Sequence, residues 1–396
     1  MPAEAQVPAS KPTSLCHRVL VVFNTPHLYG MERAVIELFD FLRPEVEAKF
    51  LLTYTSLRLR LPLLDLIQQK QLPYIFLSDR QGWPRISKPR SLREAWKIVS
   101  ALVRGNWDTL CAARRHDAIY LPGFPYAFLA LAACLWMRLR GGRVFLHFHE
   151  LLDPSPAQRV LAFLVTDCLH STHFGYGVMT ESRPYLKSRR HWIVPPRTEQ
   201  PVAVKNAETV DFGAGRKLFF LGQISKDKGI DILLDAFREI APGYPDVSLH
   251  IFGSGDRESF LEDQIRCPPL EGRVRWWGYL PQARSLLAQA YICVFPTLPS
   301  RVQESFGRSL IESMSLGVPY VCFAGGTARE ISGPDPAGIV VAEENSGALA
   351  AALRRFLDDA EFHDDCSRQA RRTFEEHYSD ATLRSRWLDV FRRTKT

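Results

Sequence analysis

The chain has 396 residues, of which 46% are hydrophobic and 23% are charged, and its net charge is +7. This length is sufficient for two domains of ordinary size, and the composition is that of a soluble globular protein, which excludes a low-complexity chain. Eight scattered cysteines form no Cys-x-x-Cys pair. They predict reduced thiols, most of them core residues, in a cytosolic protein.

The first 16 residues are rich in Pro, Ala and Ser and predict a disordered tail. The apolar run that follows, Val19–Phe23, is too short for the core of a signal peptide. Residues 118–137 hold no charge and are nominally long enough to span a bilayer. Because Pro122, Gly123 and Pro125 divide this stretch, a buried strand, turn and helix are the preferred interpretation.

Short apolar strands alternate with amphipathic helices along the chain, which is typical of α/β proteins with parallel sheets. In the first half we expect strands over Arg18–Phe23, Lys49–Tyr54, Tyr74–Leu77, Ala118–Leu121, Arg143–Phe148, Gly177–Thr180 and His191–Val194. The helices expected there include Glu32–Leu42, Arg90–Arg104 and Ala157–Leu169. Residues 195–215 are Pro-rich at first, polar and aperiodic, and predict an interdomain linker.

A second α/β series follows the linker. Its expected strands are Lys217–Leu221, Val247–Phe252, Val274–Trp277, Ile292–Phe295, Pro319–Phe323 and Ile339–Val341, and helices follow Gly229, Asp256, Pro281, Gly307 and Asn345. Two doubly wound, Rossmann-like domains facing a cleft are therefore the predicted architecture. The expected division is a tail over 1–16, an N-terminal domain over 17–200, a C-terminal domain over 201–380 and a helix over 381–396 that could cross back to the first domain.

The positive charge is unevenly placed. Residues 1–200 hold 26 Lys/Arg against 16 Asp/Glu, whereas residues 201–396 hold 24 against 27. The excess concentrates in Arg80–Arg115, where nine basic residues meet only two acidic ones and Trp83, Trp96 and Trp107 are interleaved. Basic residues with interfacial tryptophans suit an anionic membrane surface. A solvated basic face is the alternative, and the absence of a recognised binding motif argues against nucleic acid.

A loop with two lysines joins the first strand of the second series to its helix. Lys226 and Lys228 precede Gly229 there. A lysine at a strand-to-helix loop is well placed to neutralise phosphate, with help from the helix N-terminus. The alternative is a pair of solvated loop charges.

Two glutamates eight positions apart, Glu304 and Glu312, flank the glycine-bearing turn before the helix that starts near Arg308. At helical rise eight residues span about 12 Å, roughly the distance from a nucleotide's ribose to a sugar on its second phosphate. The pair therefore predicts a nucleotide-sugar site. The alternative is that Glu304 caps the helix and Glu312 is a solvated surface carboxylate.

The order of these motifs resembles the family 4 glycosyltransferases of the GT-B fold. The resemblance covers about 120 residues, is strong from 217 to 342 and is looser before. It is carried by Gly222, Lys228-Gly229, Leu233-Leu234, Ala236-Phe237, Gly253-Ser254-Gly255, Trp277-Gly278-Tyr279, Phe295-Pro296, Glu304 with Glu312, Gly317-Val318-Pro319, Gly325-Gly326 and Glu330.

The resemblance implies a role for each matching position. Glu312 would bind the ribose hydroxyls, and Lys228 would neutralise the leaving pyrophosphate. Glu304 and the amides of residues 305–307 would meet the donor sugar and its phosphates. The residues implied for donor binding are Gly30, Gly222, Gln223, Gly253, Gly255, Ser305, Phe306, Gly307 and Glu312, and those implied for catalysis are Glu304, Lys228 and His149.

The chain departs from the family pattern at two places. The family usually has arginine where this chain has Gln223, and glutamine lacks the charge and the bidentate fork. In the first half, Tyr29-Gly30-Met31-Glu32-Arg33 resembles the family's glycine-rich loop but holds one glycine instead of two. Close approach of the backbone to a donor phosphate would therefore depend on Gly30.

A histidine pair ends the strand expected over 143–148. His149 is the preferred match to the family's functional histidine, with His147 as an alternative, and a polar strand end is the other interpretation. Asp167, His170 and His173 share one helical stripe if the helix continues, but a fourth metal ligand is lacking, so we predict no metal site. Gly253-x-Gly255 lacks the third glycine of a dinucleotide fingerprint, which argues against an NAD enzyme.

These patterns predict a glycosyltransferase that moves a sugar from a nucleotide-sugar donor to a glycan or lipid-linked acceptor, with retention as the resemblance implies. It would need no cofactor and would be cytoplasmic or peripheral on the inner membrane face. Gln223 keeps open a non-catalytic GT-B protein that binds a nucleotide sugar or acts as a scaffold. A sugar-nucleotide epimerase of similar fold is a further alternative.

Overall fold

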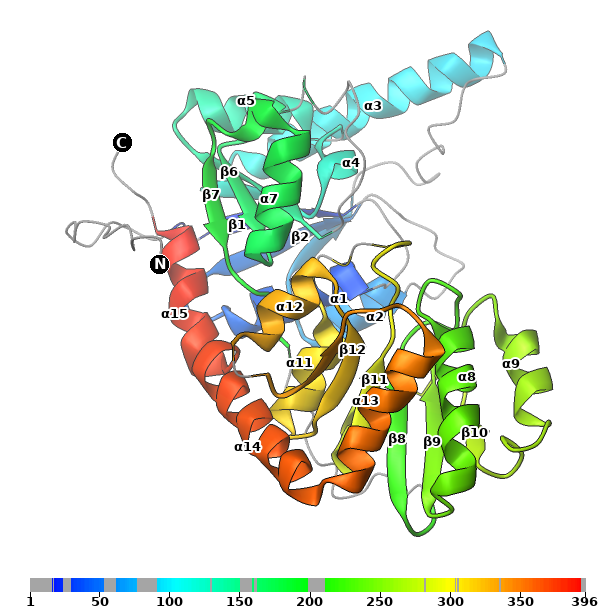
Figure 1. Cartoon of the computed structure of the whole chain (residues 1–396). Coiled ribbons are helices and arrows are strands. Elements are labelled where there is room, and N and C mark those ends of the chain that lie inside the picture. Colours follow the sequence, from blue (N-terminus) through cyan, green and yellow to red (C-terminus); the bar gives the residue numbers. More distant parts are fainter. Residues whose placement is uncertain are drawn as a thin grey trace. The chain divides into compact units, whose positions relative to one another are not determined.

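The computed structural model describes residues 16, 18–23, 30–52, 62–76, 91–128, 130–149, 159, 162–198, 211–280, 283–302, 304, 306–334 and 336–392. The chain divides into two compact units. Unit 1 consists of Met1–His170, Met179–Pro196 and Leu383–Thr396, and unit 2 of Ser171–Val178 and Arg197–Thr382. Residues 171–178 therefore lie in unit 2, although the domain predicted over 17–200 includes them. Figure 1 shows the elements in chain order.

Unit 1 contains a parallel seven-stranded sheet with the order β3-β2-β1-β4-β5-β6-β7. Its strands are β1 (Arg18–Phe23), β2 (Glu47–Leu52), β3 (Tyr74–Phe76), β4 (Ala118–Leu121), β5 (Arg143–Phe148), β6 (Asp167–His170) and β7 (Arg190–Ile193). The helices of the first half are α1 (Gly30–Phe41), α2 (Pro62–Gln69), α3 (Leu92–Ala113), α4 (Phe124–Ala127), α5 (Leu131–Leu139) and α7 (His173–Ser182). The reversal of strand order at β1 and β4 is the arrangement of a doubly wound sheet.

Unit 2 contains a parallel six-stranded sheet with the order β10-β9-β8-β11-β12-β13. The strands are β8 (Arg216–Leu221), β9 (Val247–Phe252), β10 (Val274–Trp276), β11 (Ile292–Phe295), β12 (Tyr320–Phe323) and β13 (Gly338–Val341). The helices are α8 (Ile230–Ile240), α9 (Glu258–Ile265), α10 (Ala283–Leu286), α11 (Arg308–Ser315), α12 (Gly326–Ser332), α13 (Ser346–Asp358), α14 (Ala360–His377) and α15 (Asp380–Phe391), the last of which continues into unit 1.

The strands of unit 2 are buried on both faces, because successive residues of a strand point to opposite sides. Leu218 and Phe220 of β8 pack in one hydrophobic cluster with α8 and α13. Phe219, between them, packs in another cluster with Phe252 and Cys293. Apolar runs without polar alternation are what a sheet covered by helices on both faces requires.

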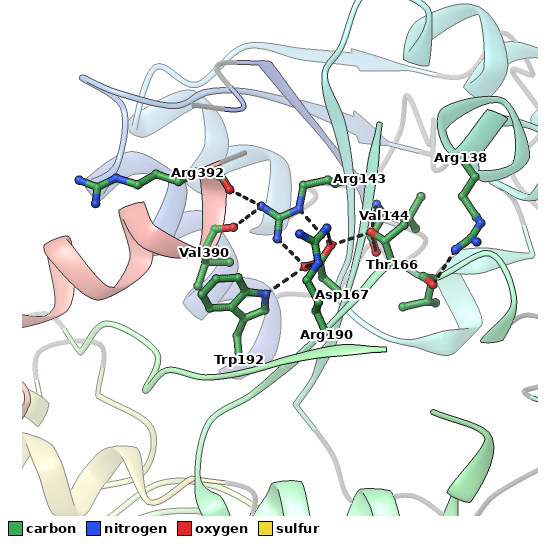
Figure 2. A network of polar contacts seen from close by, with 10 residues as sticks. Arg138, Arg143, Val144, Thr166, Asp167, Arg190, Trp192, Val390 and Arg392 are labelled. Atoms are coloured by element: carbon green, nitrogen blue, oxygen red, sulfur yellow. Dashed lines mark hydrogen bonds and ion pairs between the residues drawn. The ribbon is translucent and has the colours of Figure 1, made fainter. Parts of the chain in front are cut away.

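A buried ion cluster fastens the C-terminal helix to the sheet of unit 1 (Figure 2). Arg143 donates through Nε to Asp167 at 3.0 Å and through its terminal nitrogens to Asp167 and to the carbonyls of Val390 and Arg392. Trp192 Nε1 donates to the same carboxylate at 3.0 Å, and Arg190 Nε lies 3.1 Å from it. The carbonyls at the end of α15, which have no partner within the helix, are thus satisfied by an arginine of β5.

Burial alone would raise the pKa of Asp167. Hydrogen bonds and charge from Arg143, together with hydrogen bonds from Thr166 and Trp192, outweigh burial and hold this pKa below its ordinary value. Asp167 is therefore a charged structural residue.

The alternation of strands and helices is confirmed for most of the chain. All six strands expected after the linker are present, as are the helices that follow Gly229, Gly307 and Asn345. Residues 118–137 form β4, α4 and part of α5, as the strand, turn and helix interpretation requires. Helix α12 was not predicted from the sequence.

Three expectations for residues 157–180 are wrong. Residues 167–170 form β6 instead of ending a helix, so Asp167 and His170 do not share a helical stripe with His173. The strand expected over Gly177–Thr180 lies inside α7. The start of α7 is stabilised by tertiary contacts, because the Glu330 carboxylate accepts hydrogen bonds from the backbone N–H groups of His173 and Phe174 at 2.7 and 2.8 Å. A carboxylate at a helix N-terminus overrides the local preference for a strand.

Residues 1–15 of the expected tail lie outside the described residues. Cys16, the last residue of the expected tail, is buried, and its backbone N–H donates to the carbonyl of Phe391 at 2.9 Å. Six of the eight cysteines are buried, as expected. Among the described residues, the helices are all too short or too polar to cross a membrane. The same residues bring together no group of three His, Cys, Asp or Glu side chains suited to a metal ion.

Candidate functional site

Lys228 and Glu304 form an ion pair in unit 2. Lys228 lies in the loop after β8, Glu304 lies in the loop after β11, and Lys228 Nζ contacts Glu304 Oε1. These two strands are neighbours in the sheet, so their carboxyl ends lie side by side. Thr297 Oγ1 donates to Glu304 Oε1 at 3.2 Å, and Thr327 Oγ1 donates to the Glu304 carbonyl at 2.6 Å. The carboxylate and its backbone are thus both held in place.

Gly229 allows the two loops to meet. Its φ is +69°, and a Cβ at this position would lie 2.0 Å from the carbonyl oxygen of Pro296, just after β11. Only glycine combines this backbone conformation with such a close approach. The loop of Lys228 therefore packs directly on the loop that carries Glu304, and the backbone N–H of Leu298 donates to the Asp227 carbonyl at 2.9 Å.

Glu312 is buried on α11, with 1% of its surface exposed. Arg284 Nε of α10 lies 3.0 Å from Glu312 Oε1, and the Arg284 side chain remains 32% exposed. Burial raises the pKa of the Cys293 thiol on β11, and the nearby charge of Glu312 raises it further. The alternative of a solvated surface carboxylate is therefore wrong for Glu312.

Glu304 is not the cap of α11. The N-cap position belongs to Gly307, and no side chain caps the helix there. Burial raises the pKa of Cys322 on β12 to about 12, and the charge of Glu304 contributes to the shift.

Gly222, Gly253 and Gly255, which were expected to approach a donor, lie where the loops after β8 and β9 pack against each other. A Cβ at Gly253 would lie 1.8 Å from the carbonyl oxygen of Gly222, and a Cβ at Gly255 would lie 2.2 Å from that of Ile224. The backbone N–H of Gly222 in turn donates to the Phe252 carbonyl at 3.1 Å. The loops after β8 and β9 are therefore in backbone contact, and the steric need for glycine at 253 and 255 arises within the chain.

The remaining donor-binding candidates of unit 2 occupy different environments. Gln223 is exposed in the loop after β8, three residues before the exposed Lys226. Phe306 is half-buried in a hydrophobic cluster with Leu310 and Ile311 of α11. Ser305 lies outside the described residues.

The candidates of the first half belong to unit 1. Gly30 is the first residue of α1, so residues 30–33 of the expected glycine-rich loop lie in this helix, and Tyr29 lies outside the described residues. His147 is 1% exposed and forms a hydrogen bond through Nδ1 with the Tyr120 hydroxyl. Burial lowers its pKa well below the ordinary value, and His149 and His170 lower it further. His149 is half-buried just after β5, its ring 3.8 Å from that of His147. His147 is thus a neutral core residue, which leaves His149 as the more accessible candidate.

Arg284, Thr297 and Thr327 were not predicted from the sequence. Thr297 follows β11 by two residues, so its place at a strand's carboxyl end was a usable signal. Arg284 lies in a four-residue helix, α10, far from Glu312 in sequence, and no pattern links the two. Thr327 lies in the first turn of the unpredicted α12.

Comparison with known proteins finds a family model that resembles this part of the chain. Residues 206–373 match the model of the family "Glycosyl transferases group 1". Every unit 2 residue described above at the strand ends falls within this segment. This family model matches less than half of the chain.

Two curated relatives each match part of the chain. The chain is 27% identical over 179 residues to an uncharacterized glycosyltransferase of Methanocaldococcus jannaschii, a match that covers 45% of each chain. It is 31% identical over 146 residues to a phosphatidyl-myo-inositol mannosyltransferase of Mycolicibacterium smegmatis, with 37% of each covered. The matches thus span less than half the length of these relatives.

Solved structures match over nearly the whole chain. Anabaena HepE in complex with UDP and glucose aligns with a TM-score of 0.71 and 16% identity, covering 94% of this chain and 98% of that one. A glycosyltransferase from Rickettsia africae aligns with a TM-score of 0.76 and 14% identity, covering 95% and 97%. The protein therefore has the GT-B fold of two Rossmann-like sheets, as predicted.

Proposed function

We propose that the protein is a glycosyltransferase that moves a sugar from a nucleotide-sugar donor to a glycan or lipid-linked acceptor, with retention of anomeric configuration. The observation that carries the proposal is the Lys228–Glu304 ion pair in the loops after β8 and β11, followed by the buried Glu312 on α11, all within the segment that matches the family model. Ligands of doubly wound sheets bind at the carboxyl ends of the strands.

Lys228 would stabilise the negative charge of the leaving group. The bond between the sugar C1 and the diphosphate oxygen breaks, and negative charge develops on the leaving diphosphate. An ammonium group already held at the strand ends stabilises that charge without reorganisation. In the free protein Glu304 neutralises Lys228, so a bound diphosphate would share or replace this contact.

Glu304 and Glu312 would position the donor. The Glu304 carboxylate would accept hydrogen bonds from hydroxyls of the sugar, and Glu312 would accept from the two hydroxyls of the ribose. The acceptor hydroxyl would then attack C1 from the face that the diphosphate leaves and give its proton to a departing phosphate oxygen. Most of the rate enhancement would come from positioning and charge stabilisation.

Arg284 adds a feature to this scheme. It contacts Glu312 and is itself one-third exposed, so it forms part of the wall on which a nucleotide would lie. In unit 1, His149 would hydrogen-bond the donor sugar and the backbone at Gly30 would meet a donor phosphate. The protein would act in cell-surface polysaccharide or glycolipid synthesis, in the cytoplasm or on the inner membrane face.

A panel of nucleotide sugars tests the proposal. The wild type should bind at least one donor and release nucleotide from it, slowly with water and faster with an acceptor. Glu312→Ala should weaken binding, and Lys228→Ala should slow release with little effect on binding. Binding and release at wild-type level in both variants would remove this site assignment.

Gln223 favours a second candidate, a non-catalytic protein that binds a nucleotide sugar or acts as a scaffold. Its exposed amide stands where the resembling family usually has arginine, and a lost charge in the transition state costs a few kcal/mol in such sites. This candidate predicts donor binding without nucleotide release under any acceptor condition. A sugar-nucleotide epimerase would instead change the donor with no acceptor and no release.

A further inference from the structure

Helix α3 carries an apolar stripe that faces solvent. Its members are Leu92, Trp96, Val99, Val103 and Trp107, which are 92%, 72%, 49%, 64% and 59% exposed. They are spaced by three or four residues and so fall within an arc of about 80° on the helix. Large apolar side chains are therefore gathered on one face instead of scattered singly over the surface.

The packed face of α3 lies on another side and is confined to its second half. Gly105, Thr109 and Ala113 are buried there. Asn106 donates to the Phe128 carbonyl at 3.0 Å and accepts at 3.0 Å from the backbone N–H of Ala132 in α5. Before residue 105, the described side chains of α3 are exposed or half-buried. Figure 1 shows this first part of α3, in cyan, extending beyond α5.

Exposed apolar side chains concentrate in unit 1. Of the eleven large hydrophobic residues exposed in the described chain, ten lie in unit 1 and one, Tyr279, lies in unit 2. Besides the stripe, three of them are on α5, which packs beside α3: Leu135, Trp136 and Leu139. The accumulation belongs to one part of the fold and is not a general property of the surface.

Positive charge accompanies the stripe. Residues 91–115, which contain α3 and the two residues after its last turn, hold five basic residues and two acidic ones. Arg93 and Arg104 are exposed on α3, and Arg114 and Arg115 are exposed just after it. On the helix, Arg93 and Arg104 lie roughly 100° to 120° from Leu92 and so border the stripe.

We infer that α3 docks on an anionic lipid membrane, with the stripe inserted at the depth of the headgroups and Trp96 and Trp107 at the interface. Amphipathic helices with apolar and aromatic residues on one face and arginines beside them bind such surfaces. Charge favours lipid over a second copy of the chain, because two copies that met through α3 would bring two strongly basic segments together. The inference goes beyond the proposed function and depends on no step of glycosyl transfer.

Co-sedimentation of the full chain with vesicles tests the inference. The wild type should bind vesicles of phosphatidylcholine with about one-third phosphatidylglycerol at low salt, and should bind phosphatidylcholine alone at least about tenfold more weakly. Raising the salt to about 0.5 M should also release it, because the attraction is screened. Failure to bind the anionic vesicles at low salt would overturn the inference.

A matched pair of variants locates the contact. Trp96→Ser with Val103→Ser should reduce vesicle affinity at least about tenfold, because two inserted side chains are lost. The control, Phe163→Ser with Tyr279→Ser, removes two exposed apolar side chains elsewhere and should stay within about twofold of the wild type. All four side chains are at least half exposed, so the melting temperature should not move. Equal binding by the two variants would contradict the inference.

Two further measurements separate insertion from other uses of the stripe. Brominated lipids should quench tryptophan fluorescence in the wild type and quench less in Trp96→Phe, which keeps an apolar side chain and its binding. If the wild type does not bind vesicles but forms dimers, and the stripe variant is a monomer, a second copy of the chain is the occupant. This result would overturn the inference that α3 docks on a membrane.

Discussion

Each unit has a buried carboxylate that faces an arginine, and the two pairs differ in the surroundings of the arginine. In unit 1, the side chain of Asp167 is 0% exposed, and that of Arg143, its ion-pair partner, is 6% exposed. In unit 2, Glu312 is 1% exposed, and Arg284, which contacts it, is 32% exposed. Asp167 also accepts from Thr166 and Trp192.

The exposure of the arginine distinguishes a charge that stabilises the fold, that of Arg143, from a charge that a ligand could contact, that of Arg284. The guanidinium of Arg143 donates hydrogen bonds to Asp167 and to two carbonyls at the end of α15, so its charge is enclosed by protein (Figure 2). Arg284 leaves part of its side chain in water, where an incoming nucleotide could reach it. A buried acid is thus informative about function only together with the exposure of its partner.

The largest expected effect comes from Arg143→Met. Removal of the guanidinium leaves Asp167 as a buried charge and two helix-end carbonyls without donors, so the free energy of unfolding should fall by about 3–5 kcal/mol. Urea denaturation followed by circular dichroism measures it. Arg392→Met, which breaks the exposed pair with Asp389, should cost less than about 1 kcal/mol. Similar losses in the two variants would show that burial does not distinguish these pairs.

The same variant has a predicted pH signature. Because the pKa of Asp167 is lowered in the folded state, its contribution to stability is present above the unfolded pKa of about 3.9 and is lost as the pH falls through the lower folded value. The gap between wild type and Arg143→Met should therefore shrink below about pH 4. Arg284→Met should lower the free energy of unfolding by at most about 2 kcal/mol at neutral pH, because the Arg284 side chain is partly exposed.

Lys228→Ala should give the largest effect on activity. Loss of the ammonium group removes charge stabilisation of the leaving diphosphate, so turnover should fall by about 10²–10³-fold. Steady-state nucleotide release measures it. Lys226→Ala is the matched control from the same loop, exposed and outside the ion pair, and should lower turnover by no more than about fivefold. A larger effect at Lys226 would move the phosphate contact to that residue.

Glu312→Gln should weaken donor binding without destabilising the protein as Arg143→Met does. Loss of a charged hydrogen bond to the ribose costs about 1.5–3 kcal/mol, which raises Kd by about 10- to 100-fold. Isothermal titration with the donor found in the panel measures Kd. Glu262→Gln on the surface of α9 serves as a control for the loss of one negative charge. An unchanged Kd in Glu312→Gln would assign Glu312 to structure, like Asp167.

The smallest effect is expected for Gln223→Arg. Two lysines of the same loop already supply positive charge, so turnover should change by less than about threefold. A gain of about a hundredfold or more would contradict this and would indicate that the natural chain has lost a transition-state contact. Gln223→Lys adds charge without the bidentate fork and separates the two contributions.

Most strands were predictable because they are apolar runs between turn residues. Strand β6 was missed since Asp167 and His170 are polar, and their burial depends on partners from β5 and β7 that only the folded sheet supplies. The start of α7 depends likewise on Glu330, more than 150 residues away. Local sequence carries no signal for such contacts.

The candidate site was predictable where its residues stand in a recognisable order. Lys228, Glu304 and Glu312 were named from motif spacing, and that spacing reflects the strand-loop-helix geometry of one Rossmann-like unit. The contact with Arg284 could not be predicted, because α10 is short and nothing in its sequence marks the direction of its arginine. Sequence therefore named the acids of the candidate site, whose roles stay predictions, and missed a basic partner of one of them.

The contact between Glu330 and the start of α7 has a consequence for dividing the protein. A Cβ at Gly326 would lie 2.1 Å from the ring of Phe174, so residues 171–178 are fitted closely into unit 2. Trp387 and Phe391, from the end of the chain, are fully buried in the core of unit 1. A single cut in the segment 199–210 would therefore leave the first fragment without part of its core and the second without a helix start, because neither unit is one continuous piece of chain.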